Sequence, residues 1–244
     1  MQYVYIISAI IVGAVVLLCL FQNRIYRIPT WKLLITAIVI VGAGLLGISL
    51  LYYIEYGVWG GKSFFGCIFI TPIALWAVSK SIHVQTEALM DMAGPICAAF
   101  LALIKSNCLY YGCCEGIVLK TLENGTMIRF PSQIVEGLNG IVICVVLLLM
   151  QRNSKNRGCL APAFLILFGV TRFILNTFRD HLWSLGIFHR MGLFVPRGHL
   201  WAAICIIWGI IWMYRARSRV YGRKLSAKEF IKSIFGLLPL KECA

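Results

Sequence analysis

The sequence predicts an all-α, polytopic membrane protein with seven transmembrane helices. Its 244 residues are 60% hydrophobic and 13% charged, whereas a soluble domain has about 45–50% apolar and about 25% charged residues. The apolar residues form seven stretches near the length of roughly 20 residues that a helix needs to cross a bilayer. Because lipid-exposed backbone must satisfy its own hydrogen bonds, we expect these stretches to be helices.

The seven expected spans share one transmembrane domain, residues 1–214, and a basic cytoplasmic tail, residues 215–244, follows it. The spans are, in chain order, about residues 3–21, 33–53, 62–79, 92–111, 133–151, 159–178 and 198–214. The first one lacks the basic start and the small-residue cleavage site of a signal peptide, so we expect it to stay as a helix.

Lys and Arg are distributed unequally between the two sides of this bundle. Of the 23, fifteen fall in the first, third and fifth connections and the tail, and six fall in the other connections. Cytoplasmic loops carry such an excess, so the N-terminus is expected outside and the C-terminus inside. The net charge of +14 then predicts mainly that the basic tail binds anionic lipid at the cytoplasmic surface. No base-stacking or groove-reading motif accompanies it, which argues against nucleic-acid binding.

The cysteine pattern predicts neither a disulfide scaffold nor a metal site. Half of the ten cysteines lie in apolar runs, where cysteine behaves as a small hydrophobe: Cys19, Cys67, Cys97, Cys144 and Cys205. No CxxC pair with a histidine partner is present. Cys113 and Cys114 lie at a charged turn, where an inert and a chemical role both remain open.

The segment Leu103–Glu136 places ionisable residues among apolar ones. Lys105 lies near the end of the fourth span, Glu115 in the following turn, and Arg129 just before the fifth span. Ionisable groups at membrane depth are costly and are functional candidates. In the predicted orientation they gather at the outer leaflet, whereas Asp91, at the inner end of the fourth span, is expected to be structural.

The sixth and seventh spans add charges at the same depth. Arg172, Asn176 and Arg179 are spaced by four and three residues, so they share one helical face. Two arginines there can hold a phosphate by charge-assisted hydrogen bonds. His199 begins the seventh span. Structural interpretations stay open beside these: a buried Arg129–Glu136 pair, cations that snorkel to the interface, and an outer aromatic belt.

Five motifs, in matching order and spacing, resemble those of the prolipoprotein diacylglyceryl transferase family. They are GGKSFFG at 60–66, IKSNCLYYGCCEG at 104–116, RFPSQIVEG at 129–137, RFILNTFRD at 172–180 and GHLW at 198–201. The third is similar to the family's Pro-Ser/Thr-Gln-Leu-Tyr-Glu motif and is the most specific. The resemblance covers most of the chain from about Trp59 to Trp212.

The resemblance implies an enzyme of the cell membrane whose active site faces the extracytoplasmic leaflet. Such an enzyme moves a diacylglyceryl group from phosphatidylglycerol to the cysteine thiol of a lipobox-bearing prolipoprotein and releases glycerol phosphate, without metal or cofactor. Together with the charge pattern it assigns catalysis to Lys105, Arg172, Glu115 and His199. It assigns substrate binding to Arg129, Ser132, Gln133, Glu136, Arg179, Asn176, Gly112, Gly116 and Cys108.

The chain departs from the family pattern where protons are handled. Phe65 stands for a histidine, Lys105 for an arginine, Cys113 for an acidic residue and Asn176 for a glutamate. A divergent transferase with another acceptor therefore remains open, as does a non-catalytic lipid-binding or partner-stabilising protein on the same scaffold. A transporter is less favoured, since no matching pair of Gly/Pro-broken spans indicates inverted repeats.

Overall fold

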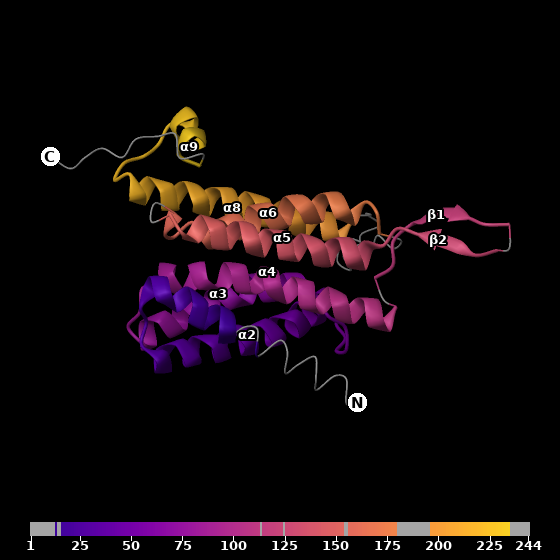
Figure 1. Cartoon of the computed structure of the whole chain (residues 1–244), viewed down its shortest axis with the longest axis horizontal. Helices are drawn as coiled ribbons and strands as arrows, with labels where there is room; N and C mark the ends of the chain where they lie inside the picture. The colour runs from indigo at the N-terminus through magenta and orange to yellow at the C-terminus, as the bar shows by residue number, and fades with distance from the viewer. Residues whose placement is uncertain are drawn as a thin grey trace.

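The computed structural model describes residues 13, 16–112, 114–123, 125–153, 156–179 and 196–234, without the side chains of Asn107 and Tyr111. Long helices lie alongside one another in two layers, one of α2–α4 and one of α5, α6 and α8 (Figure 1). Their bounds are α2 Thr30–Tyr56, α3 Phe64–Ser81, α4 Thr86–Tyr111, α5 Ser132–Gln151, α6 Leu160–Asn176 and α8 Arg197–Val220. A short helix, α9 (Ala227–Ile234), follows.

Five of these helices, α2, α3, α4, α5 and α8, are long and apolar enough to cross a membrane, and α6 is a shorter apolar helix. Residues 16–26 are helical, whereas most of the first expected span, 3–21, lies outside the described residues. The structure thus agrees with a helical, polytopic membrane protein. The number of seven spans and the direction of the termini stay predictions.

Some helices extend beyond the apolar stretches that predicted them, whereas α6 is two residues shorter at its end than the expected 159–178. α4 begins at Thr86, before the expected residue 92, and α8 continues to Val220, beyond the expected residue 214. An apolar stretch identifies only the lipid-facing middle of a helix. The hydrogen-bonded helix also includes polar residues at its ends. The expected start of the tail at residue 215 therefore lies inside α8.

The prediction of an all-α fold was wrong in one place. An antiparallel hairpin of β1 (Val118–Thr121) and β2 (Met127–Arg129) projects from one end of the bundle between α4 and α5 (Figure 1). Its turn contains the sequence Asn124-Gly125, a strong hairpin signal, and Gly125 has φ of 82°. The span count missed it because it treated residues 112–132 only as a connection.

Small residues let the two layers approach. A Cβ added to Gly140 of α5 would lie 2.8 Å from the carbonyl oxygen of Ala98 on α4. Such close crossings are common where membrane helices associate, because packing replaces the hydrophobic effect there. The crossing fixes the depth and rotation of α5 against α4, and so the relation of their charged residues.

Asp91 ties the opposite end of the bundle together. Its carboxylate accepts hydrogen bonds from the backbone N–H groups of Gly158 at 2.5 Å and Leu160 at 2.9 Å, and from the Tyr26 hydroxyl at 3.2 Å. It therefore caps the N-terminus of α6 from a neighbouring helix, where negative charge is favourable. These contacts agree with the structural role expected of Asp91.

Candidate active site

Three cationic side chains converge on the carboxylate of Glu136. Lys105 Nζ lies 2.6 Å and Arg172 Nη1 2.5 Å from Oε2, and Arg179 Nη1 lies 3.9 Å from Oε1. The Glu136 side chain is 3% exposed, and none of the three cations exceeds 18%. We call these four residues the Glu136 cluster. The predicted gathering of these charges at one depth is thus present in the structure.

The ends of α4 and α5 bring Lys105 and Glu136 together. Lys105 lies in the last two turns of α4, and Glu136 lies in the second turn of α5. A Cβ on Gly137 would be 3.6 Å from the Lys105 Cβ, so the lysine stem runs along a helix surface without a side chain. Gly112, with φ of 63°, caps α4 by donating to the carbonyl of Cys108. Gly112 therefore ends α4, because glycine readily adopts this left-handed backbone conformation.

The end of α6 and the start of the hairpin position the two arginines. Arg172 lies in the last turns of α6, and Arg179 follows the helix in an antiparallel bridge with Gly116. A Cβ on Gly116 would come within 2.3 Å of the carbonyl oxygen of Phe130. Only glycine fits there, and the bridge it makes directs Arg179 toward Glu136. Gly116 therefore contributes to the site indirectly, by positioning Arg179.

Arg129 and Glu115 form a separate, more exposed pair beside the Glu136 cluster. Arg129 Nε lies 3.2 Å from Glu115 Oε2, and the Glu115 side chain is 48% exposed. Arg129 Nη1 also donates to the carbonyl of Gly116 at 3.3 Å. The structure therefore pairs Arg129 with Glu115, and the ion pairs of Glu136 come from the other three cations.

Ser132 and Gln133 are buried at the start of α5. The Ser132 hydroxyl donates to the carbonyl of Cys114 at 2.5 Å, which joins the turn after α4 to the N-terminus of α5. Ser132 therefore holds the segment after α4 against the start of α5. Cys113, the neighbour of Cys114, lies outside the described residues.

Cys114 is half-buried beside the Glu136 cluster. A hydrogen bond from Cys108 lowers the pKa of the Cys114 thiol to about 4, helped by the positive charges of Lys105 and Arg179 and opposed by burial and by Glu136. Hydrogen bonds and positive charge stabilise the thiolate in this way. Cys108, which is expected to bind substrate, contacts Cys114 in the structure.

Asn176 and His199 form a second polar contact near the arginines. Asn176 Nδ2 lies 2.8 Å from His199 Nδ1. An amide nitrogen can only donate, so His199 Nδ1 accepts, and the neutral ring then carries its hydrogen on Nε2. Asn176 is buried, and the His199 ring meets Phe173 edge-on at 4.8 Å between centroids. In this tautomer His199 offers a hydrogen-bond donor.

The sequence analysis missed a second buried ion pair at the same end of the bundle. Arg197 Nε lies 2.9 Å from Glu55 Oε2, and Trp201 Nε1 donates to Glu55 Oε1 at 2.5 Å. Arg197 also donates to the Tyr56 hydroxyl at 3.0 Å. The same rule that selected Lys105 could have found Glu55, because it is a carboxylate at the end of a long apolar stretch.

The arrangement suits an anionic ligand. Among the described residues, three buried cations face the Glu136 carboxylate and the half-buried Cys114 thiolate, so the site keeps a net positive charge. Buried charge without a counter-charge is costly, and arginine is suited to phosphate in such a place. Within the part of the chain that the structure describes, no three His, Cys, Asp or Glu side chains form a metal site.

The fold and the site define a helical membrane protein with a cluster of buried charged side chains at the hairpin end of its bundle. The family model of prolipoprotein diacylglyceryl transferase matches residues 3–215. The chain belongs to this family.

Its relatives include the phosphatidylglycerol–prolipoprotein diacylglyceryl transferases of three bacteria. The protein of Idiomarina loihiensis is 34% identical over 40% of this chain and 36% of its own length. The protein of Hydrogenovibrio crunogenus is 25% identical over 66% and 65%, and that of Pseudoalteromonas atlantica 27% over 72% and 70%. The chain thus spans between about a third and two thirds of the first relatives that it matches.

Proposed function

We propose that the protein moves a diacylglyceryl group from phosphatidylglycerol to the cysteine thiol of a prolipoprotein or a related acceptor. The observation that carries the proposal is the buried excess of positive charge around Glu136, contributed by Lys105, Arg172 and Arg179. Family membership and the names of the relatives support the same reaction. The predicted orientation places this site in the extracytoplasmic leaflet of the cell membrane.

In this reaction the acceptor thiolate attacks the glycerol carbon that carries the phosphate ester. A carbon–sulfur bond forms, the carbon–oxygen bond breaks, and glycerol phosphate leaves with the electron pair. Arg172 and Arg179 bind the phosphate, and Lys105 adds a third charge. Positive groups already in place stabilise the charge that develops on the leaving phosphate. Glu136 holds the three cations together and offsets their mutual repulsion.

The proton and the phosphate require different partners. The Glu115 carboxylate is half-exposed and can take the proton of the incoming thiol, while Arg129 orients it. The tautomer of His199 set by Asn176 instead donates from Nε2, to an oxygen of the phosphate. In this proposal Glu115 accepts the proton of the thiol, and His199 donates a hydrogen bond to the phosphate.

The alternative is a lipid-binding protein that kept the scaffold without the reaction. The observation that favours it is Phe65, which stands for the family's histidine and is buried between aromatic rings, 5.7 Å from Phe168 and 6.5 Å from Trp201 between centroids. The phenyl ring of Phe65 cannot take up or donate a proton, so it cannot replace a histidine in proton transfer.

The test incubates the full-length protein with headgroup-labelled phosphatidylglycerol and a lipobox peptide, and follows glycerol phosphate and lipidated peptide. Both products are expected, and Arg172→Ala should reduce their rate about 10²–10³-fold, as loss of one charge-stabilising donor does. Arg152→Ala, which removes an exposed arginine at the opposite end of the bundle, is the control. Glycerol phosphate without lipidated peptide means another acceptor, and no product from any phospholipid leaves the lipid-binding alternative.

A further inference from the structure

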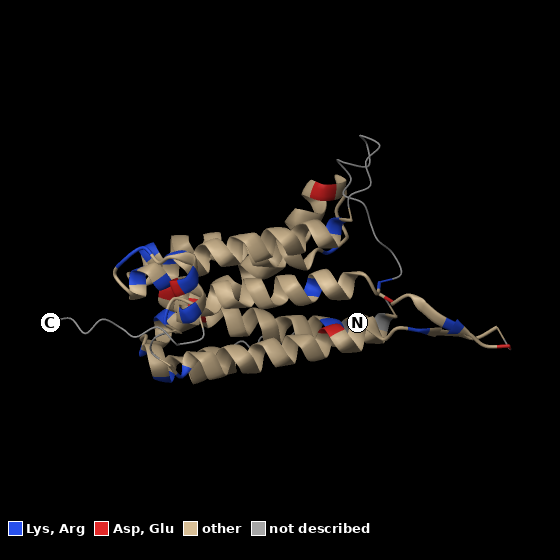
Figure 2. Ribbon diagram, turned by 90° about the horizontal axis from the view of Figure 1, so that it is seen from above, with Lys and Arg blue, Asp and Glu red and all other residues tan. Residues whose placement is uncertain are grey.

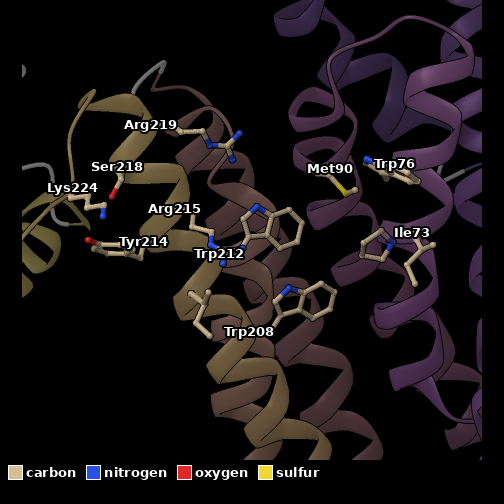
Figure 3. Close-up of a pocket in the computed structure, with 12 residues that line it drawn as sticks. Ile73, Trp76, Met90, Trp208, Trp212, Tyr214, Arg215, Ser218, Arg219 and Lys224 are labelled. Atoms are coloured by element: carbon tan, nitrogen blue, oxygen red, sulfur yellow. The ribbon is translucent and has the colours of Figure 1, made fainter.

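A cavity lies between α3 and α4 on one side and α8 on the other (Figure 3). Its lining includes the last residues of α8, at the end of the bundle away from the hairpin. Its volume is about 830 Å³, within the range of about 300–1,000 Å³ typical of ligand sites. Apolar side chains of α3 and α4 face those of α8 across it, as Figure 3 shows. They are Pro72, Ile73, Trp76 and Met90 on one side and Trp208, Ile211 and Trp212 on the other.

One end of the cavity is polar and basic. Arg215, Ser218 and Arg219 of α8 line it together with Lys224. Arg219 is paired with Glu87, whereas Arg215 and Lys224 form no ion pair with another described residue. Lys and Arg also gather generally at this end of the bundle (Figure 2).

The hydroxyl of Ser218 supplies a second, independent observation. Its oxygen is buried and has no hydrogen-bond partner among the described residues, although Ser218 lines the cavity. A buried polar group without a partner is costly, and such groups in native proteins usually have a ligand or water to meet. A headgroup oxygen in the cavity would satisfy it.

This cavity is separate from the Glu136 cluster. Arg197 begins α8 at the hairpin end, and Arg219 lies 22 residues further along the same helix. At 1.5 Å per residue the two positions are about 33 Å apart, close to the roughly 30 Å thickness of the hydrocarbon core of a bilayer. A lipid whose headgroup meets the basic end of the cavity therefore belongs to the other leaflet.

We infer that the cavity binds an anionic glycerophospholipid from the leaflet opposite the Glu136 cluster. Its acyl chains fill the apolar part beneath Trp208 and Trp212, and its phosphate meets Arg215, Lys224 and the hydroxyl of Ser218. Basic pockets between membrane helices on the cytoplasmic side bind anionic headgroups in this way, and tryptophan favours this depth. The inference does not depend on the proposed transferase activity.

Tryptophan in the cavity wall provides the readout. The full-length protein in mixed micelles is titrated with phosphatidylserine or phosphatidylcholine that carries bromine on its acyl chains, and the quenching of fluorescence is recorded. The Trp208→Phe/Trp212→Phe variant gives the part of the signal that other tryptophans contribute. Phosphatidylserine is used because the proposed donor at the other leaflet is phosphatidylglycerol. We expect brominated phosphatidylserine to quench the tryptophan fluorescence at a mole fraction several-fold below the one that phosphatidylcholine requires.

Variants that remove single charges test whether the preference for phosphatidylserine arises at the basic end of the cavity. Each basic residue near an anionic surface contributes about 1 kcal/mol, so Arg215→Gln and Lys224→Gln should each reduce the preference about fivefold. Ser218→Ala should reduce it less. Lys228→Gln, which removes the same charge from exposed α9 outside the cavity, should leave it unchanged. Arg215 and Lys224 are exposed, so these variants should keep the wild-type melting temperature.

Three results would overturn the inference. The first is equal quenching by the two lipids in the wild-type protein. The second is an equal loss in Lys228→Gln and Lys224→Gln, which would mean attraction to the basic tail in general. The third is a preference that emerges only after deletion of residues 235–244, which would make this segment the occupant of the cavity.

Discussion

Lys105 and Glu136 form an ion pair across the α4–α5 interface, with 2.6 Å between Nζ and Oε2 and side chains that are 8% and 3% exposed. The pair does not stand alone, because Arg172 approaches the same carboxylate oxygen at 2.5 Å. Among the described residues, Glu136 is therefore the carboxylate that joins the ends of α4, α5 and α6. Its loss and the loss of one cation should have unequal effects.

Glu136→Gln should lower stability more than Lys105→Met does. Removing the carboxylate breaks the ion pairs of three cations at once, and breaking a buried pair in this way costs about 3–5 kcal/mol. In Lys105→Met the carboxylate keeps Arg172. Thermal unfolding in detergent, followed by circular dichroism, measures both variants and their double variant. Equal melting temperatures for Glu136→Gln and the wild-type protein would show that the cluster does not stabilise the fold.

Gly140→Ala should disturb the site from a distance, whereas Gly137→Ala should not. The added Cβ at residue 140 meets the Ala98 carbonyl oxygen at 2.8 Å, a backbone atom that cannot turn aside, while at residue 137 the nearest atom is 3.6 Å away. Overpacking of this kind costs about 1–3 kcal/mol. We expect Gly140→Ala to lower both the melting temperature and transferase turnover by moving Lys105 away from Glu136. Equal behaviour of the two variants would contradict this.

Part of the site could be predicted from the sequence because the membrane restricts where charge can go. Lys105, Glu136, Arg172 and Arg179 were expected at one depth, and the structure brings them together. Depth follows from position along a helix, which the hydropathy pattern supplies. The sequence alone therefore assigns these four residues to one region of the bundle.

The choice of partners could not be predicted, because it depends on the rotation and crossing of the helices. Arg129 meets Glu115 instead of Glu136, since the hairpin carries it alongside the turn after α4. Glu55 pairs with Arg197 from a helix that begins 142 positions later in the chain. Neither contact leaves a periodic signal, because each is set by a close approach of separate elements.

His199 should act through a hydrogen bond that it donates. Glutamine can donate but cannot take up a proton at neutral pH, so His199→Gln should keep turnover within about threefold of the wild-type rate. His199→Leu removes the donor and should lose about tenfold, the effect of one hydrogen bond of about 1.4 kcal/mol. Turnover is followed as glycerol phosphate release. If His199→Gln is as inactive as His199→Leu, the residue acts as a proton acceptor and the donor role is wrong.

Cys114 should react as a thiolate well below neutral pH. The hydrogen bond from Cys108, with Lys105 and Arg179, holds the pKa of the Cys114 thiol near about 4, against about 8.5 for a free cysteine. Because the lowered pKa favours the charged form, the thiolate predominates at every pH above about 4. Alkylation by iodoacetamide should therefore stay nearly constant between about pH 8 and pH 5, whereas an ordinary thiol slows about tenfold for each unit below its pKa.

The alkylation of Cys114 is measured by peptide mass mapping in a Cys113→Ser background, so that the adjacent thiol does not contribute. Cys108→Ala removes the largest contribution to the lowered pKa and should move the whole profile to higher pH. Cys205→Ala, which changes a buried cysteine of α8, should leave the profile in place. A rate that falls tenfold per unit below pH 8 in the Cys113→Ser protein would mean that Cys114 is an ordinary thiol, and the positive charge of Lys105 and Arg179 would then be directed at the ligand alone.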